Sequence, residues 1–536
     1  MSASPDVQLV VGQPCERDAQ QVMEWRNDPE TLRQSLHSTP KRWPAFYDEF
    51  RAEYCDDARW PPLFGQVDGR LVGFVRLRRC EDPRRLDRAT VEIGVNVAPS
   101  ERGRNIGTAL IRRAAEFAAG QGADVILAEI KPDNRRSISA FGGAGFSRID
   151  EIEKALEDGS SVRVIRYENV LVPVLSLRGA DGTSRRLGPG HPVFIIAEAG
   201  SNWRMGTPAR DRRMAEALID VAAAAGCDAV KFQTYRPETV YVENAGTSDY
   251  LAGAGIKESI RDIFADLAMP YELIPELAAY CEKRKIMFMS TPFSTADFDA
   301  LDPFVPMHKL ASYEISHRRL IEKMAASGKP VIMSTGASTL DDIRWALGHF
   351  RRHGGASVAL MQCTARYPAP IDALNLEAIP LMRSTFGVPV GLSDHSREPS
   401  VGPAAAAVLG AAVIEKHFTL DQRLPGPDHG FAVGPDELLG MVRAVRQAEA
   451  SRGSGLKTVL PAEDELRAFA RRGLQATQPI RRGDILREGT NFDTLRPGKC
   501  PQGAHPRHVE AIEGRAALRE IEVGHGIELS DVDADV

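Results

Sequence analysis

The chain has 536 residues, of which 43% are apolar and 26% are charged, and its formal net charge at pH 7 is −6. This length exceeds what one hydrophobic core accommodates, so we expect two to four domains. The composition excludes a disordered chain and a membrane protein, and the charge gives no electrostatic basis for binding nucleic acid.

Residues 1–175 predict a mixed α/β domain. The strand-like runs LVGFVRL, TVEIGVNV and DVILAEI alternate with helical stretches such as residues 107–119. A loop rich in Arg and Gly follows TVEIGVNV and leads into one of these helices. The N–H groups in the first turn of such a helix are suited to a pyrophosphate.

Two motifs of this region resemble a known family. VEIGVNVAPSERGRNIGTALIRRAAEFA and PDNRRSISAFGGAGF resemble the acetyl-CoA loop and closing motif of the GNAT acetyltransferases. MEWRNDPETLRQS is similar to the subgroup that acylates amines on nucleotide-linked deoxysugars, as in pseudaminic acid biosynthesis. The resemblance implies a GNAT-like fold, acetyl-CoA as co-substrate, and Glu92 as a general base acting through water. It implies that CoA is bound by Arg102, Gly103, Arg104, Asn105, Gly107 and Asn134.

The GNAT resemblance has two departures. Asn105 replaces a usual glycine, and Phe141 stands where many members place the tyrosine that protonates the departing thiolate. Water or another residue must then supply that proton. An inactive domain that only binds CoA or a sugar remains the alternative.

The central part of the chain predicts a barrel. Residues 178–190, RGADGTSRRLGPG, lack apolar periodicity, so we predict a linker over 176–190. Eight strand-like runs follow, each before helix-compatible sequence: VFIIAEA, AVKFQT, IMFMSTPF, MHKLAS, PVIMSTG, VALMQCT, PVGLSD and AVIEKHFT. Eight such units predict a TIM (β/α)8 barrel over 191–455. Residues 235–285 form an insertion long enough to hold a loop over the barrel mouth.

Polar residues end these strands, where a TIM barrel carries its active site. They are Glu198, Lys231, Gln233, Thr291, Lys309, Ser312, Ser334, Thr335, Gln362, Ser393, His395, Glu415 and His417. Any one of these residues, taken singly, is as easily explained as an ordinary polar strand end facing solvent. Their recurrence at all eight strand ends favours an active site. Inward lysines are desolvated charges that need an anion. With hydroxyls and the N–H groups of residues 334–336, they suit a phosphate and a carboxylate together, as in phosphoenolpyruvate.

Two histidines close neighbouring strands. Adjacent strands lie about 4.8 Å apart, so His395 and His417 are close enough to hold one divalent ion. Lone histidines are usually not ligands, but this pair leaves coordination positions open for water and a substrate carbonyl. We predict manganese or magnesium in preference to structural zinc.

From about residue 190 to its end the chain resembles the sialic acid synthase family. IAEAGSN, VKFQT, STPF, KLASYE, STGA, CTARYP, VGLSDHS, VIEKHFTLD and PGPDH occur in the family's order. The family condenses phosphoenolpyruvate with an open-chain N-acetylmannosamine-like sugar to a nine-carbon 2-keto acid, releasing phosphate by C–O cleavage.

The resemblance assigns roles to individual residues. It implies that phosphoenolpyruvate is bound by Lys231, Thr291, Lys309, Ser312, Ser334 and Ser393, and manganese by His395 and His417. Glu198, Gln233, Tyr367 and Asp428 would face the sugar, and Glu415 is expected to contact substrate. Glu314 would manage protons for the attacking water; we expect Glu198 to take part in the chemistry as well. Trp203 and Ala365 stand where His and Asn or Ser are usual, and this leaves the sugar open.

After a second predicted linker, residues 456–470, the chain ends in short β-prone pieces separated by RRGD, RPGK and EVGHG turns. They predict a small β-rich domain over 471–536. It resembles the antifreeze-like SAF (β-clip) domain that caps the partner's active site in this family. Arg496 matches the arginine that reaches the other subunit's sugar site, which implies a domain-swapped homodimer. The simpler interpretation is a solvated arginine beside a turn.

Three functional hypotheses follow. The first is a bifunctional cytoplasmic enzyme that acylates an amino-sugar precursor and makes a nonulosonic acid from phosphoenolpyruvate, with no nucleic-acid or membrane partner. The second keeps the synthase and makes the first domain a non-catalytic regulator. The third makes the barrel a carbohydrate-binding scaffold, a role for which two buried lysines are costly. Neuraminic, legionaminic and pseudaminic precursors and plain mannose all remain open as the sugar.

Overall fold

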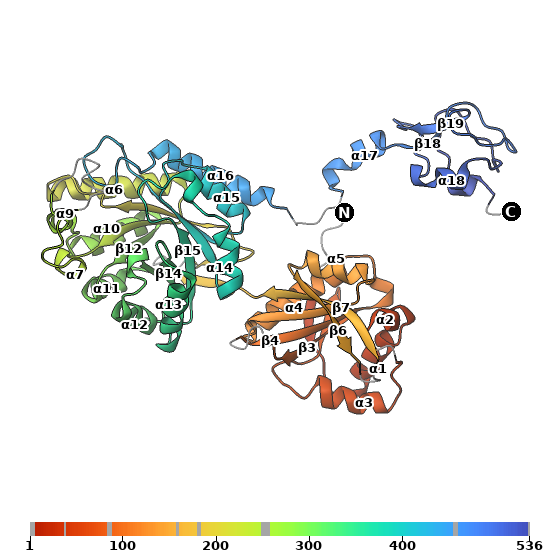
Figure 1. The fold of residues 1–536 in the computed structure, drawn as a ribbon, viewed down its shortest axis with the longest axis horizontal. Helices are drawn as coiled ribbons and strands as arrows, with labels where there is room; N and C mark the ends of the chain where they lie inside the picture. The colour runs from red at the N-terminus through yellow and green to blue at the C-terminus, as the bar shows by residue number, and fades with distance from the viewer. Residues whose placement is uncertain are drawn as a thin grey trace. The chain divides into compact units, whose positions relative to one another are not determined.

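The structure is a computed structural model that describes residues 6–36, 39–82, 88–156, 160–178, 184–247, 258–453 and 459–533. In Figure 1 an N-terminal α/β domain runs from red to orange, a barrel runs from yellow to light blue, and a small C-terminal domain is blue. The C-terminal domain is a compact unit of its own. Among the described helices, none combines the length and the apolar character needed to cross a membrane.

The N-terminal domain is one seven-stranded sheet in the order β1-β2-β3-β4-β5-β7-β6. Its strands are β1 (Gln8–Val11), β2 (Leu63–Val67), β3 (Arg70–Cys80), β4 (Thr90–Val97), β5 (Val125–Ile130), β6 (Ser147–Ala155) and β7 (Ser161–Val170). Its helices are α1 (Glu16–Arg26), α2 (Pro29–Gln34), α3 (Ala45–Glu49), α4 (Ile106–Gly120) and α5 (Arg135–Gly143). The three predicted strand runs and the predicted helix are therefore confirmed as β3, β4, β5 and α4.

Strands β4 and β5 are the one parallel pair of this sheet, and they diverge. Residues 90–92 pair with residues 125–127, after which β4 continues to Val97 and β5 to Ile130 without pairing each other. Helix α4 packs against the sheet through Ile106, Leu110 and Ile111, which are buried in the domain core. The divergence opens a gap in the sheet beside the start of α4.

The central domain confirms the predicted barrel. Its eight strands are parallel and hydrogen-bonded in the order β12-β11-β10-β17-β16-β15-β14-β13, and the two end strands contact each other, which nearly closes the ring. The strands are β10 (Phe194–Gly200), β11 (Ala229–Thr234), β12 (Met287–Pro292), β13 (His308–Leu310), β14 (Val331–Ser334), β15 (Val358–Cys363), β16 (Val390–Asp394) and β17 (Val413–His417). Each is followed by one helix of the outer layer: α6 (Pro208–Ala225), α10 (Leu273–Arg284), α11 (Thr295–Leu301), α12 (Arg318–Ala326), α13 (Leu340–Arg352), α14 (Ala378–Phe386), α15 (Val401–Val408) and α16 (Pro435–Ser451).

The outer helices are amphipathic, as α13 illustrates. Thr339 and Asp342 form a capping box at its start. Its buried residues Ile343, Ala346, Leu347 and Phe350 recur at helical spacing and face the barrel core. Because the strands lie between these helices and the barrel interior, they are buried on both faces and read as continuous apolar runs that end in polar residues.

The segment predicted as a linker over 176–190 is instead structured. Its described part contains a hairpin of β8 (Leu175–Arg178) and β9 (Ser184–Leu187). Leu175, Leu177 and Leu187 are buried with strand-start residues such as Phe194 and Met287, so the hairpin covers the amino-terminal end of the barrel interior. The alternation of its leucines is too short to stand out among the surrounding Arg and Gly residues.

The insertion after β11 and the second predicted linker also contain helices. Helices α7 (Pro237–Val240) and α9 (Ile260–Leu267) lie within residues 235–272, and residues 248–257 of that insertion lie outside the described residues. Helix α17 (Asp464–Ala470) occupies the end of the predicted linker over 456–470. The C-terminal domain follows with β18 (Gly473–Ala476), β19 (Phe492–Leu495) and α18 (Val509–Ile512) around a small apolar core.

Candidate active sites

Two lysines are buried at the carboxyl ends of the barrel strands. The side chains of Lys231 on β11 and Lys309 on β13 are 4% and 3% exposed. Lys231 Nζ lies 2.6 Å from Glu198 Oε2 and 3.7 Å from Glu415 Oε1, and Lys309 Nζ lies 3.9 Å from the same Glu415 oxygen. Two cations and two carboxylates thus share one buried space. An entering anion would compete with these carboxylates for the lysines.

The four charges shift one another's protonation. Burial raises the pKa of Glu198 to about 7, against the opposing charge of Lys231. For Glu415, Lys231 and Lys309 outweigh burial, and the pKa lies below its usual value. Burial would lower the pKa of Lys231, but the two glutamates outweigh it and raise that pKa; for Lys309 burial prevails and lowers the pKa. Glu198 is therefore the member of the set that changes protonation near neutral pH.

Hydroxyl groups surround the two lysines. Thr291 Oγ1 accepts a hydrogen bond from Lys231 Nζ at 3.0 Å, and Ser334 Oγ accepts one from Lys309 Nζ at 2.6 Å. Ser393 Oγ donates to Glu415 Oε1 at 3.2 Å. Ser312 Oγ accepts from the Gly336 N–H at 3.0 Å, which places it beside the turn after β14. All six residues that the sequence assigned to one anion are accordingly found near the barrel mouth.

Two strand-end residues point elsewhere. Thr335 donates to the main-chain oxygen of Met361, and Gln362 donates to that of Leu374. Their side chains thus hydrogen-bond to main-chain oxygens in β15 and after it. Lys416, to which sequence reasoning gave no role, is buried on the opposite face of β17 and bonds Asp394 Oδ2 at 2.7 Å. The two-residue alternation of the strand separates this structural lysine from Glu415 and His417.

His395 and His417 lie side by side. Their ring centroids are 5.3 Å apart, and both side chains are buried. His395 Nδ1 lies 3.0 Å from the main-chain oxygen of Thr364, so it acts as the donor and Nε2 keeps its lone pair. His417 Nδ1 is buried without a hydrogen-bond partner in the described part of the chain, and its nearest carboxylate oxygen belongs to Asp428, at 3.9 Å. Burial and the neighbouring cationic groups hold the pKa of His417 well below its usual value, which keeps the imidazole neutral. The neutral imidazole of His417, with its unshared lone pair, fits a divalent cation. For His395, burial would lower the pKa, but Cys363 and the Thr364 main-chain oxygen outweigh it and raise that pKa.

Sequence reasoning missed Cys363, the last residue of β15. Its Sγ lies 3.8 Å from His395 Nδ1 and 3.5 Å from Ser312 Oγ. A lone cysteine carries no spacing signal, so the sequence analysis gave it no role. Its position at a strand end was the signal that could have found it.

A second group of polar side chains lies beside the histidines. Gln233 Nε2 donates to Glu198 Oε1 at 2.8 Å, and Ser201 Oγ lies 3.4 Å from Asp428 Oδ2. The ring of Tyr367 has its centroid 4.1 Å from that of His395. Burial raises the pKa of Asp428 above its usual value. The predicted sugar-facing residues are therefore neighbours of the predicted metal pair.

Glu314 stands in the short 3-10 turn after β13 (Ser312–Glu314) and is half-buried. Burial raises its pKa to about 7. Such a carboxyl exchanges a proton with bound water near neutral pH.

The two departures in the barrel differ in position. Trp203 belongs to the apolar core between strands and helices, and its indole N–H is buried without a partner among the described residues. Ala365 follows β15, and its main-chain oxygen accepts from the Tyr313 hydroxyl at 3.5 Å.

Arg496 follows β19 on the C-terminal domain and is exposed.

The N-terminal domain holds a cavity of about 820 Å³ at the divergence of β4 and β5. Residues 93–97 of β4, Glu129 and Ile130 of β5, and the starts of α4 and α5 line it. The predicted residues among its walls are Glu92, Arg102, Gly103, Asn105, Gly107, Asn134 and Phe141. Arg104 is not part of this wall: it is exposed and pairs at 3.0 Å with Glu101, which does line the cavity. The resemblance to the acetyl-CoA loop made it a candidate, and its side chain is 65% exposed in this structure.

Several of these residues have partners inside the domain. Arg102 Nη2 bonds Asp28 Oδ2 at 2.5 Å, and Arg78 Nη2 bonds Glu92 Oε2 at 2.7 Å. Asn134 caps α5 through Ser137 N at 3.1 Å. Asn105 has φ +59° immediately before α4, a backbone conformation that Asn tolerates better than most residues, which explains how it replaces a glycine there.

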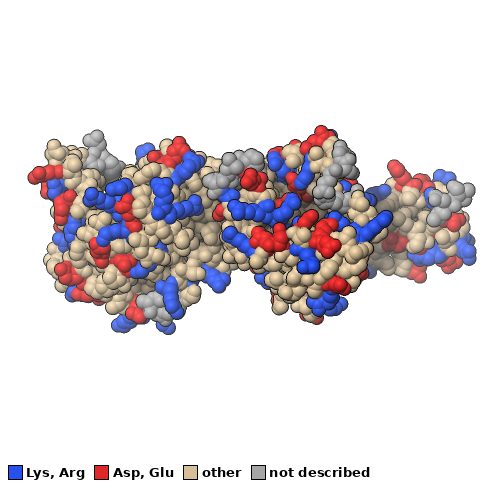
Figure 2. Space-filling view, turned by 90° about the horizontal axis from the view of Figure 1, so that it is seen from below, with Lys and Arg blue, Asp and Glu red and all other residues tan. Residues whose placement is uncertain are grey.

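The charge of the cavity wall is unbalanced. Seven of its residues are cationic and four are acidic: Arg26, Arg76, Arg78, Arg102, Arg135, Arg136 and Lys154 against Glu30, Glu92, Glu101 and Glu129. On the face in Figure 2, by contrast, blue and red side chains are interspersed over the described residues. The cavity is therefore suited to a ligand with several negative charges.

Comparisons with known proteins agree with this organisation. The profile described as NeuB family matches residues 218–457, that of the Acetyltransferase (GNAT) family matches residues 19–146, and that of the SAF domain matches residues 471–533. The N-terminal domain thus has the GNAT fold, and the barrel and SAF domain follow it in the predicted order.

Several relatives match this chain over nearly their whole length. The spore coat polysaccharide biosynthesis protein SpsE of Bacillus subtilis is 40% identical over 65% of this chain and 96% of its own length. Two Campylobacter jejuni proteins follow: an N,N'-diacetyllegionaminic acid synthase, 36% identical over 61% of this chain and 96% of its own length, and a pseudaminic acid synthase, 34% identical over 63% and 96%.

Proposed function

The chain belongs to the NeuB family, and we propose that its barrel condenses phosphoenolpyruvate with an N-acylated amino-sugar aldehyde and water, releasing phosphate. The observation that carries this proposal is the buried pair Lys231 and Lys309 within a ring of hydroxyls. Phosphoenolpyruvate brings a phosphate and a carboxylate, which would replace Glu198 and Glu415 as the partners of the two lysines.

The reaction divides among the residues at the barrel mouth. C3 of phosphoenolpyruvate forms a C–C bond with the aldehyde carbon, whose oxygen takes up a proton and becomes a hydroxyl. Water adds at C2, and the C2–O bond breaks to release phosphate and leave a keto group at C2. The anion would be bound by Lys231, Lys309, Thr291, Ser312, Ser334 and Ser393. Glu314, with its pKa raised to about 7 by burial, would accept the proton of the attacking water.

The sugar would lie beside the histidines. Its hydroxyl and acylamino groups would be oriented through hydrogen bonds by Gln233, Glu198, Tyr367 and Asp428. Glu415 would contact the substrate beside the anion. His395 and His417 would hold manganese or magnesium. When bound, such an ion would supply Lewis-acid polarisation of the sugar carbonyl.

We further propose that the N-terminal domain transfers acetyl from acetyl-CoA to the amine of an amino-sugar precursor. The support is the 820 Å³ cavity with its excess of cationic residues beside the first turn of α4. Arg102, Gly103, Asn105, Gly107 and Asn134 would surround the CoA pyrophosphate, with Arg104 at its solvent side.

In this transfer, Glu92 would accept the amine proton through water, the amine would form the new amide bond, and the C–S bond would break. Phe141 is buried against Phe146 in the cavity wall and offers no hydroxyl. Water, or one of the wall hydroxyls of Tyr54, Ser137 and Ser139, would therefore protonate the thiolate. The alternative is a non-catalytic domain that binds a sugar or CoA and regulates the synthase.

Phosphate release is the test of the barrel proposal. The full chain is incubated with phosphoenolpyruvate, manganese and, in parallel, N-acetylmannosamine, N,N'-diacetyl precursors of legionaminic and pseudaminic type, and mannose. Aldehyde-dependent phosphate release is expected with one of them, and the name of the N,N'-diacetyllegionaminic acid synthase relative favours a diacetylated sugar. If none of these aldehydes gives phosphate release, the synthase proposal is refuted.

Free-thiol release from acetyl-CoA tests the N-terminal domain. Turnover with an amino-sugar nucleotide supports the transferase; binding of acetyl-CoA without turnover across such a panel supports the regulator. We also propose a cytoplasmic homodimer in which Arg496 completes the partner's sugar site.

A further inference from the structure

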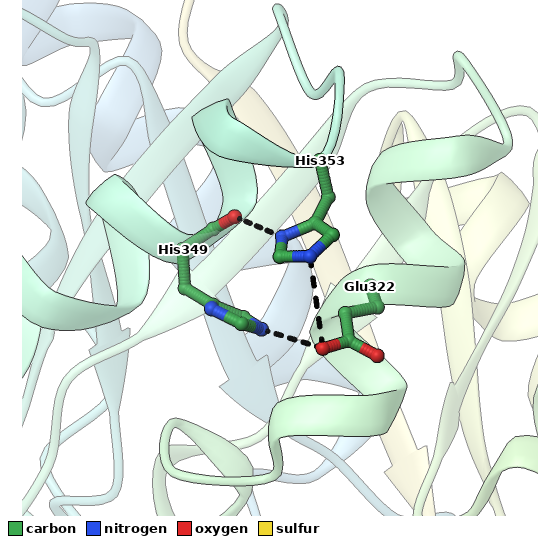
Figure 3. Close-up of side chains that lie close together, drawn as sticks. All are labelled: Glu322, His349 and His353. Carbon is green, nitrogen blue, oxygen red and sulfur yellow. Dashed lines mark hydrogen bonds and ion pairs between the residues drawn. The ribbon is translucent and has the colours of Figure 1, made fainter.

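The outer layer of the barrel carries a cluster of metal-ligating side chains away from the strand ends. Figure 3 shows Glu322 on α12 and two histidines, His349 near the end of α13 and His353 just beyond it, converging on one point. One ligand atom from each lies within 4.8 Å of the others. Among the described residues, this is the one such group of three. We infer that it is a second metal site, distinct from the histidine pair in the barrel and taking a transition-metal ion such as zinc.

Helix geometry brings the two imidazoles together. His349 and His353 are four residues apart and so lie on one face of the same helical turn, with ring centroids 4.4 Å apart. Helices α12 and α13 pack against each other, which places the Glu322 carboxylate opposite this pair. His349 Nε2 lies 3.0 Å and His353 Nε2 lies 3.8 Å from the same oxygen, Glu322 Oε1.

The hydrogen bonding of His353 leaves a place for a cation. Its Nδ1 lies 2.9 Å from the main-chain oxygen of His349 and therefore carries the proton. In the neutral ring, Nε2 then presents a lone pair toward a carboxylate oxygen, and two acceptors repel unless a proton or a metal ion lies between them. A backbone carbonyl that fixes the tautomer of a histidine is also the usual support of a metal-bound imidazole.

The ligand set selects the type of ion. Two imidazole nitrogens and one carboxylate oxygen suit zinc, cobalt, nickel or copper better than magnesium or calcium, which prefer oxygen. Zinc bonds of about 2.0–2.2 Å require ligand atoms about 3.3–3.5 Å apart. The two Nε2 atoms lie 3.0 and 3.8 Å from Glu322 Oε1, on either side of this spacing, so small side-chain movements suffice to reach it. His353 is 41% exposed, which gives the ion a path and leaves a fourth position to water.

Neighbouring groups permit this closure. Arg318 Nη1 lies 3.5 Å from Glu322 Oε1, but its side chain is 63% exposed and is free to turn into solvent. Trp345 stacks on His349, with centroids 5.3 Å apart and planes within 4°. A bound ion would tie α12 to α13, the helices that follow β13 and β14, and so stabilise the part of the barrel that carries Lys309 and Ser334.

Stoichiometric metal binding by the full chain tests this site. In a His395→Gln/His417→Gln variant, which lacks the barrel pair, we expect one zinc or cobalt ion per chain after dialysis. A further His353→Gln change should remove it, lowering the affinity at least about tenfold. His525→Gln is the matched control, since that side chain on the C-terminal domain is exposed to a similar degree (38%).

Two further readouts guard against a misfolded variant. Zinc in hundredfold excess over its Kd should raise the Tm of the barrel by about 3–6 °C in the wild-type chain, and by clearly less with His353→Gln. Copper should quench the fluorescence of Trp345, and Trp345→Phe should abolish that fraction of the quenching. Synthase turnover should be unchanged in His353→Gln. Retention of the ion in the triple variant, or its absence from the His395→Gln/His417→Gln variant, overturns the proposal.

Discussion

Lys231 Nζ lies 2.6 Å from Glu198 Oε2, with both side chains almost completely buried. The pair neutralises a buried charge that, in the proposed reaction, binds the substrate anion. Because burial raises the pKa of Glu198 to about 7, a small change in local charge alters its protonation.

Phosphoenolpyruvate should therefore bind with uptake of a proton at pH 7.5–8. The anion adds negative charge beside Glu198, which raises the pKa of that carboxyl further above about 7 and makes it take up a proton. Calorimetric titrations in buffers of different ionisation enthalpy measure the uptake. It should disappear in Glu198→Gln and persist in Glu238→Gln, an exposed carboxylate on α7. A binding enthalpy independent of the buffer would contradict the assignment.

Synthase turnover should lose activity below about pH 7. Glu314 has a pKa of about 7 through burial and must be ionised to accept the proton of water, so kcat rises as pH increases through that value. Glu314→Gln should lower kcat about 10²- to 10⁴-fold while phosphoenolpyruvate still binds. If the acid limb vanished in Glu198→Gln instead, the limb would belong to Glu198. Normal turnover of Glu314→Gln removes this residue from the mechanism.

Removal of metal should separate the two proposed activities of the chain. Aldehyde-dependent phosphate release should be abolished by chelation, by His395→Gln or by His417→Gln. Each change removes the ion that we propose the two histidines hold, at the place where His417 Nδ1 is buried without a partner among the described residues. Acetyl transfer in the same sample should continue, since its chemistry calls for no metal. Parallel phosphate and thiol assays measure both. Full synthase activity in chelated protein would exclude a role for the histidine pair in binding a catalytic ion.

Gly200→Ala should impair the sugar side of the site. Gly200 has φ +53°, and a Cβ there would lie 2.7 Å from Asp428 Oδ2. The substitution strains the backbone and displaces Asp428, so the KM for the sugar should rise about tenfold or more while binding of phosphoenolpyruvate is retained. Gly206→Ala is the control: its φ of +90° carries similar strain, but nothing lies within 4 Å of the added atom. Equal effects of the two changes would show that strain alone is responsible.

Subunit mixing tests Arg496. In a swapped dimer, Arg496→Ala and Glu314→Gln chains would each be inactive, yet a mixed dimer would hold one complete site. Equal mixing after dissociation should restore about a quarter of wild-type activity, because half of the dimers are mixed and one of their two sites is intact. Absence of recovery, with mixed dimers confirmed by mass, would place Arg496 in its own subunit's site or outside any site.

Much of the barrel and its mouth could be predicted from the sequence. Strands buried on both faces give continuous apolar runs, and the polar residue at the end of each run marks the same edge of the sheet. Lys231, Lys309, His395 and His417 were found in this way. The β8/β9 hairpin was missed because three leucines give too short an alternation.

Local patterning thus determined the domain order, the eight strands and the residues available at their ends, since periodicity depends only on which faces are buried. The pairing of those residues was decided by tertiary structure alone. Glu198 meets Lys231 through the neighbouring strands β10 and β11, and Glu322 meets His349 and His353 only because α12 packs on α13. Distances between side chains on different elements depend on register and packing, and so do the pKa shifts that give Glu198 and Glu314 their proposed roles.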